Sequence, residues 1–204
     1  MMHTMERYFN MSENMELTDG ISEALIKTVM KHSKILKERP DCYESRAEVM
    51  WASSLSHNDL TGCGTGGGDW ACHQLEHEIG GMFDVAHGAG LAAVWGSWAR
   101  YVYKARPERF AKFARNIFNI QETDDEKAAV AGIEAMENYY RSVGMPTSLC
   151  ELGIHATEEQ IKEMADKCSF YGKRTVGVMK KIGAPEAAEI YRMANDKSIP
   201  LYSR

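Results

Sequence analysis

The sequence lacks the features that mark membrane, secreted and nucleic-acid-binding proteins. No apolar run approaches the roughly 18 residues that a membrane span needs. The first residues, MMHTMERYFN, contain no basic segment followed by an apolar one, as a signal peptide would. Basic residues are not in excess, since 24 Lys and Arg stand against 29 Asp and Glu, giving a net charge of −5. These absences argue against a nucleic-acid partner and against a membrane partner.

The cysteines follow no metal-binding or redox spacing. The chain has five cysteines, an odd number, and no two of them form a Cys-x-x-Cys pair. They are Cys42, Cys63, Cys72, Cys150 and Cys168. This usage is typical of reduced thiols rather than of a disulfide framework, and it predicts a cytoplasmic protein.

Strand-like alternation of apolar and polar residues is also missing, whereas helical spacing runs through most of the chain. Residues 16–38 place Ile21, Leu25 and Val29 one helical turn apart, and Pro40 predicts the end of that helix. The other helices that we expect cover residues 45–60, 70–83, 90–105, 107–120, 126–144, 157–169 and 185–194. The 204 residues therefore predict one all-α domain over positions 1–204, with about eight to ten helices.

Polar residues at the starts of these segments predict the helix caps. The expected caps are Thr18 or Asp19, Asp69, a capping box at Thr123–Glu126 and a second one at Thr157–Gln160.

A glycine run at residues 62–68 matches the Gly-x-Gly-x-x-Gly pattern of dinucleotide-binding loops through Gly62, Gly64 and Gly67. That fingerprint requires a strand before the glycines, and here the preceding residues are helical in pattern. No acidic residue on a second strand about twenty residues later can be identified either. We therefore interpret Gly64–Gly68 as a flexible loop between two helices, where glycine permits positive φ or a close backbone approach.

Three histidines follow the glycine run within fifteen residues. His73 and His77 are four residues apart, so both lie on one face of a helix. His87 follows a predicted break and can meet the same face if the two helices form a hairpin. A single pair at this spacing is most often an ordinary surface feature, but three converging imidazoles are typical of a metal site. His32, His57 and His155 have no partner at ligand spacing, and we expect them to be solvated or capping residues.

The segment DWACHQLEHEIGGMFDVAHGAGLAAVWGSWARYV resembles the signature of the iron-containing (group III) alcohol dehydrogenases, especially their butanol-dehydrogenase-like branch. The similarity continues through HTMERYF, ELTDGISEALIKTV and EVMWASSLSHN upstream and through GMPTSLCELGI downstream. It covers essentially the whole chain. The resemblance implies the helical, dehydroquinate synthase-like C-terminal domain of such an enzyme, without its N-terminal dinucleotide-binding domain.

The resemblance also implies the chemistry of the site. A divalent metal, Fe²⁺ or alternatively Zn²⁺, is expected on His3, His73 and His87, and His77 is expected beside the substrate and nicotinamide in a proton relay. In the family an aspartate precedes the first histidine ligand by four residues, a position that falls before Met1. The complete enzyme would interconvert a small alcohol and an aldehyde with NAD(P)H. The alternatives for this chain are a non-catalytic truncated module that self-associates, or one half of a split enzyme that docks on a separate nucleotide-binding half.

Overall fold

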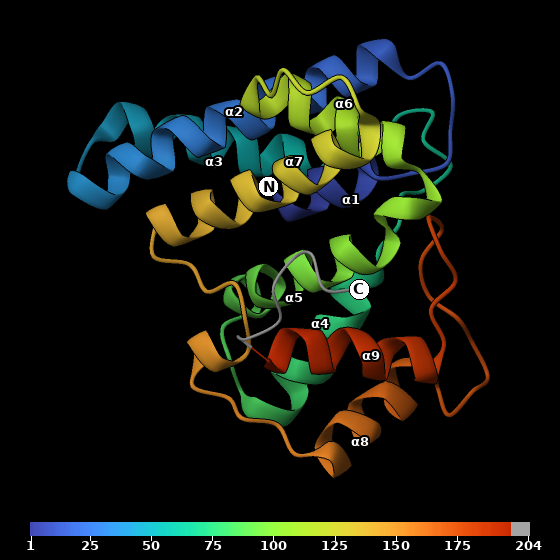
Figure 1. Ribbon diagram of the computed structural model, residues 1–204. Helices are drawn as coiled ribbons and strands as arrows, with labels where there is room; N and C mark the ends of the chain where they lie inside the picture. The colour runs from blue at the N-terminus through green and yellow to red at the C-terminus, as the bar shows by residue number, and fades with distance from the viewer. Residues whose placement is uncertain (197–204) are drawn as a thin grey trace.

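The protein is an assembly of helical hairpins, described here from a computed structural model that covers residues 1–196 (Figure 1). The nine α-helices of these residues are α1 (Met2–Tyr8), α2 (Glu16–Glu38), α3 (Tyr43–His57), α4 (Ala71–Phe83), α5 (His87–Val102), α6 (Pro107–Phe118), α7 (Asp125–Ser142), α8 (Glu158–Cys168) and α9 (Ala184–Asn195). Short 3₁₀ turns follow α3, α5 and α7, as η1 (Leu60–Gly62), η2 (Tyr103–Ala105) and η3 (Cys150–Leu152). Residues 197–204, the last part of the predicted single domain, lie outside the described residues.

The helices form two groups joined by α4 and α5. Helices α2 and α3 pair, as do α6 and α7, and these four lie around α1. Helices α8 and α9 pair on the opposite side, where α8 packs against α4 and α9 packs against α5 (Figure 1). Within residues 1–196 the β-structure amounts to one isolated bridge between Val176 and Ile182, which confirms the predicted all-α class.

Helix α5 forms the centre of the core, as its nearly uninterrupted apolar sequence predicts. Its side chains Trp95 and Trp98 are fully buried. Both contact the ring of Phe9, which directly follows α1, and Trp98 also contacts an aromatic ring of α6. Phe9 stacks on Phe110 with ring centroids 4.4 Å apart. No helix within residues 1–196 has both the length and the apolar composition that a membrane span needs.

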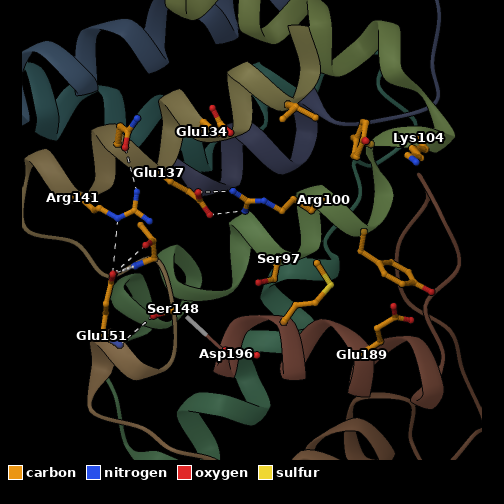
Figure 2. Close-up of a pocket in the computed structure, with 16 residues that line it drawn as sticks. Ser97, Arg100, Lys104, Glu134, Glu137, Arg141, Ser148, Glu151, Glu189 and Asp196 are labelled. Atoms are coloured by element: carbon orange, nitrogen blue, oxygen red, sulfur yellow. Dashed lines mark hydrogen bonds and ion pairs between the residues drawn. The ribbon is translucent and has the colours of Figure 1, made fainter. Parts of the chain in front are cut away.

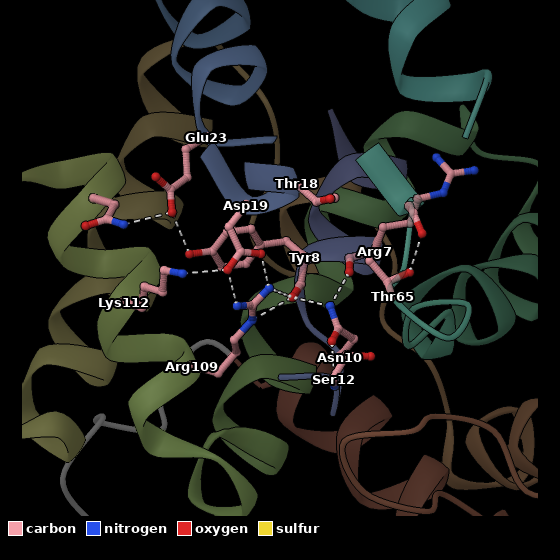
Figure 3. A network of polar contacts seen from close by, with 12 residues as sticks. Arg7, Tyr8, Asn10, Ser12, Thr18, Asp19, Glu23, Thr65, Arg109 and Lys112 are labelled. Atoms are coloured by element: carbon pink, nitrogen blue, oxygen red, sulfur yellow. Dashed lines mark hydrogen bonds and ion pairs between the residues drawn. The ribbon is translucent and has the colours of Figure 1, made fainter. Parts of the chain in front are cut away.

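A buried ion pair ties α1, α2 and α6 together (Figure 3). The Arg109 guanidinium donates to both carboxylate oxygens of Asp19, at 2.5 and 2.6 Å, and to the Tyr8 carbonyl oxygen. Lys112 donates to the same carboxylate at 2.6 Å. Burial alone would raise the pKa of Asp19, but the hydrogen bonds and charges of Arg109 and Lys112 outweigh it and hold that pKa below its usual value. Asp19 is therefore a counter-ion in the core, and the expectation that Thr18 or Asp19 caps α2 is wrong, because the helix already begins at Glu16 with Met15 as its N-cap.

The other predicted caps have mixed outcomes. The capping box at Thr157 and Gln160 is confirmed, since both reciprocal hydrogen bonds form at the start of α8. The box predicted at Thr123–Glu126 is wrong by one position, because Asp124 caps α7 by accepting from the Lys127 backbone nitrogen. Asp69 does accept from the backbone nitrogen of Ala71, but Trp70 stands between them in a left-handed conformation with φ of 61°.

Candidate metal centre

The glycine loop brings α4 against α1. Gly64, Gly66, Gly67 and Gly68 all have positive φ, as the loop interpretation predicts. At Gly68 a Cβ atom would lie 2.8 Å from the carbonyl oxygen of Glu6, so the loop backbone rests directly on α1. The Asp69 backbone nitrogen donates to that same carbonyl at 2.8 Å. The glycines thus serve a close helix contact and form no dinucleotide-binding turn, since α3 and η1 precede them instead of a strand.

The predicted histidines converge where α1, α4 and α5 meet. His73 on α4 lies at the centre, with its ring 4.4 Å from that of His3 and 5.2 Å from that of His87, measured between centroids. The break at Asp84–Ala86 turns the chain so that His87 at the start of α5 returns to the face of α4. His77 lies one turn beyond His73, with its ring 5.8 Å from that of His87. The four residues named from sequence therefore form one cluster.

His73 has the environment of a ligand. It is buried, and its Nδ1 atom contacts the Glu6 carboxylate. Its Nε2 atom is buried and has no hydrogen-bond partner among the described residues. A buried polar nitrogen without a partner is unfavourable, and in a cluster of imidazoles a metal ion would satisfy it. The residues present therefore fit a divalent metal.

The neighbouring groups keep the cluster ready to donate lone pairs. Burial, followed by the adjacent His73 and His57 rings, lowers the pKa of His3 to about 4. The His3 ring is therefore neutral near pH 7, which is the form that binds metals. His87 is half exposed, and its Nδ1 atom contacts the buried Glu76 carboxylate.

Four residues that sequence spacing did not identify also belong to the site. His57 at the end of α3 is exposed, as expected, but its ring lies 4.1 Å from that of His3, a contact that its position in the sequence does not indicate. Trp70 borders His3 and His73 at 5.6 and 5.3 Å. Glu6 and Glu76 contact two of the histidines. Glu6 lies 67 positions from its partner, a distance in sequence that no spacing rule detects, whereas Glu76 is visible beside His77 but its contact with His87 is not.

A second group of potential ligands overlaps the first at His77 and His87. Glu76, His77 and His87 place one ligand atom each within 4.8 Å of one another. However, Glu76 Oε2 already contacts His87 Nδ1, and Oε1, which has no hydrogen-bond partner among the described residues, is buried against Gly80 and Gly90. We therefore regard Glu76 as the partner of His87 rather than as a ligand beside it.

A cavity of about 630 Å³ lies away from the histidines, between α5, α7 and α9 (Figure 2). Its wall carries a bidentate pair in which Arg100 donates to both Glu137 oxygens at 2.6 Å. Its lining residues, all within the described part of the chain, include no histidine. The cavity thus offers no ligand set comparable with that of the histidine cluster.

The chain is similar in sequence to known alcohol dehydrogenases. A family model described as the Fe-containing alcohol dehydrogenase family, C-terminal, matches residues 1–194. The chain is 34% identical over 194 residues to the NADH-dependent butanol dehydrogenase A of Clostridium acetobutylicum, covering 94% of this chain and 49% of that protein. It is 30% identical to the NADPH-dependent aldehyde reductase YqhD of Escherichia coli, covering 94% of this chain and 49% of that protein.

Solved structures agree with the sequence comparison. The NADH-dependent butanol dehydrogenase A of Thermotoga maritima superimposes with a TM-score of 0.89 at 35% identity, over 96% of this chain and 50% of that one. The Escherichia coli YqhD structure gives a TM-score of 0.87 at 27% identity, over 95% of this chain and 50% of that one. The chain thus spans about half the length of the relatives it matches.

Proposed function

The chain belongs to the Fe-containing alcohol dehydrogenase family, and we propose that it is the helical, metal-binding half of an NAD(P)-dependent enzyme that interconverts alcohols and aldehydes. The relatives named above are NADH-dependent or NADPH-dependent and act on butanol or on aldehydes by their names. The nicotinamide cofactor would be held by a nucleotide-binding half, which the matched residues do not include. Five free cysteines are in keeping with a cytoplasmic location for this enzyme.

One observation carries the proposal. The buried Nε2 atom of His73 has no partner in residues 1–196, and the rings of His3 and His87 lie on either side of it at 4.4 and 5.2 Å. These three residues would hold the ion, which is Fe²⁺ in this proposal, with Zn²⁺ as the alternative. A divalent metal in such a site polarises an alcohol or aldehyde oxygen as a Lewis acid.

His77 would serve as the proton carrier. It is exposed, and its ring lies beside that of His87 rather than next to His3. An imidazole at the open edge of the cluster can pass the hydroxyl proton of the alcohol to water, or return it to the aldehyde. On the inner side of the cluster the Trp70 ring lies 5.3 Å from that of His73, and His73 itself is buried.

Metal analysis of the purified full chain tests the proposal. The wild-type protein, reconstituted with Fe²⁺ without oxygen or with Zn²⁺, should retain about one ion per chain after desalting, whereas His73→Ala should retain none. His155→Ala is the matched control, because His155 contacts the Cys150 thiol outside the cluster. Loss of metal in the control, or its retention in His73→Ala, contradicts the proposal.

A second candidate, a module that docks on a nucleotide-binding half or on a second copy, is favoured by one exposed face of α3. Tyr43, Met50 and Trp51 point outward on that helix with 78%, 69% and 63% of their surface exposed. An exposed apolar patch of this kind commonly marks an interface. Sedimentation velocity should show self-association that is weakened in Trp51→Lys. A monomeric wild-type chain that also fails to bind a nucleotide-binding half of a relative would rule this candidate out.

A further inference from the structure

We propose that Glu6 and Glu76 are positioning residues for the metal site, each holding one ligand histidine by Nδ1 so that its Nε2 atom faces the ion. This inference rests on the proposed metal-binding function. The two carboxylates come from different helices and contact different histidines, yet each contacts the Nδ1 atom of its histidine.

Glu6 connects α1 to the start of α4. It is fully buried, and one carboxylate oxygen contacts His73 Nδ1. The other oxygen accepts from the backbone nitrogen of His73 at 3.2 Å, one of the nitrogens that a helix start leaves without an internal partner. Both the ring and the backbone of His73 are thus fixed by one side chain. Because α1 also carries His3, Glu6 sets the position of one proposed ligand relative to another.

Glu76 makes the equivalent connection between α4 and α5. It is 2% exposed, and one oxygen contacts His87 Nδ1. Two glycines provide the space for its carboxylate, since a Cβ atom would lie 2.7 Å from the Glu76 Oε1 atom at Gly90 and 3.0 Å from it at Gly80. The helix interface is therefore shaped around this carboxylate.

The cost of burying these two groups points to the same role. Within residues 1–196, neither carboxylate forms an ion pair with lysine or arginine, and each contacts a histidine ring nitrogen instead. A buried carboxylate is unfavourable unless positive charge lies nearby. A cation on Nε2 supplies that charge through the imidazole, and a carboxylate on the other ring nitrogen is the usual outer partner of a metal-binding histidine. By contrast, His32 and His155 direct Nδ1 at the Ser45 hydroxyl and the Cys150 thiol.

The first measurement needs no metal. Long-range ¹H–¹⁵N NMR of the metal-free full chain should show His73 and His87 protonated on Nδ1. In Glu76→Ala the ring ¹⁵N shifts of His87 should move towards the values of a solvated imidazole, in which both tautomers are populated. Glu76→Gln should restore the Nδ1 form, because the amide oxygen also accepts from Nδ1–H. Protonation of His73 and His87 on Nε2 in the wild-type chain overturns the proposal.

The second measurement is the dissociation constant for Zn²⁺, obtained by competition with a chromogenic chelator. Glu76→Ala should bind Zn²⁺ about 10–100-fold more weakly, and Glu76→Gln should recover most of this loss. Glu137→Gln is the matched control, because Glu137 is a buried carboxylate paired with Arg100 away from the histidines, and its Zn²⁺ affinity should stay at the wild-type value. Unchanged affinity in Glu76→Ala overturns the proposal. A wild-type chain that shows the Nδ1 tautomers but binds no Zn²⁺ instead contradicts the proposed function.

Discussion

The carboxylate of Glu6 contacts Nδ1 of His73 across 67 positions of sequence, and it joins the first helix of the chain to the centre of the histidine cluster. The contact leaves the second ring nitrogen, Nε2, buried without a partner among the described residues. A carboxylate contact to Nδ1 recurs between Glu76 on α4 and His87 on α5, where the histidine is half exposed. Two helix contacts therefore converge on one small volume, and the packing of α1, α4 and α5 fixes the geometry of the site.

Replacing Gly90 by alanine should disturb this geometry. The new Cβ would lie 2.7 and 2.8 Å from two Glu76 atoms, so the carboxylate must move away from His87. We expect the free energy of unfolding to fall by about 1–3 kcal/mol, as for other overpacked sites, and Zn²⁺ affinity to fall with it. Urea denaturation and chelator competition measure the two effects.

Gly81→Ala is the control for that substitution. Nothing in the described structure lies within 4 Å of a Cβ atom at Gly81, which is also in a helix. Alanine there should be neutral or should stabilise by up to about 1 kcal/mol, since glycine is unfavourable inside helices. Equal effects of the two substitutions would contradict the tight fit around Glu76.

Replacing Asp19 by asparagine should be strongly destabilising. Its carboxylate is 4% exposed and is the ionic partner of Arg109, so the neutral amide leaves a buried guanidinium without its counter-ion. The expected loss is about 3–5 kcal/mol in the free energy of unfolding. Asp125→Asn removes a more exposed pair with Arg115 and should cost less than about 1 kcal/mol.

The pH dependence of this pair follows from the lowered pKa of Asp19. In the unfolded chain the carboxyl group titrates near 3.8, whereas in the folded protein it stays charged to lower pH. Its contribution to stability is therefore fully present above about pH 4 and is lost as the pH falls through the folded pKa. Stability that does not decrease in acid, relative to Asp19→Asn, would contradict the network in Figure 3.

The contribution of Asp69 to stability should change with pH in the opposite direction to that of Asp19. Burial raises its pKa to about 6, against the opposing hydrogen bonds from the backbone nitrogens of Met179, Val178 and Ala71. Between about pH 4 and pH 6 the folded state binds more protons at this group than the unfolded state does. The stability of the wild-type chain, relative to Asp69→Asn, should therefore decrease as the pH rises through that window. A difference that is flat or that increases between pH 4 and 6 contradicts this assignment.

The spacing of apolar residues, together with the residues that start and stop helices, was sufficient to predict most of the fold. Residues 16–38 form α2 as predicted, Pro107 begins α6, and the Thr157 capping box begins α8. These features depend on neighbours within one or two turns, which a single sequence displays. The cap predicted at Asp19 was wrong because tertiary contact with Arg109 outweighs local capping, and the sequence gives no sign of a partner 90 positions away.

The candidate site divides in the same way. The spacing of His73, His77 and His87 predicted their convergence, and the resemblance to a known family added His3. His57 was missed because its approach to His3 depends on how α3 packs beside α1. Glu6 was missed because its contact with His73 is also made between separate helices. Local pattern thus indicates potential ligands, whereas the groups that hold them become visible only when the helices are assembled.

The central claim is that His3, His73 and His87 bind the metal while His77 does not. The most direct measurement is the dissociation constant for Zn²⁺ in the full chain and in the four single alanine variants. We predict that His3→Ala, His73→Ala and His87→Ala each bind at least about tenfold more weakly than the wild-type chain, and that His77→Ala binds within about twofold of it. Loss of binding in His77→Ala together with retention in His3→Ala and His73→Ala would contradict the account and would favour the grouping of Glu76, His77 and His87.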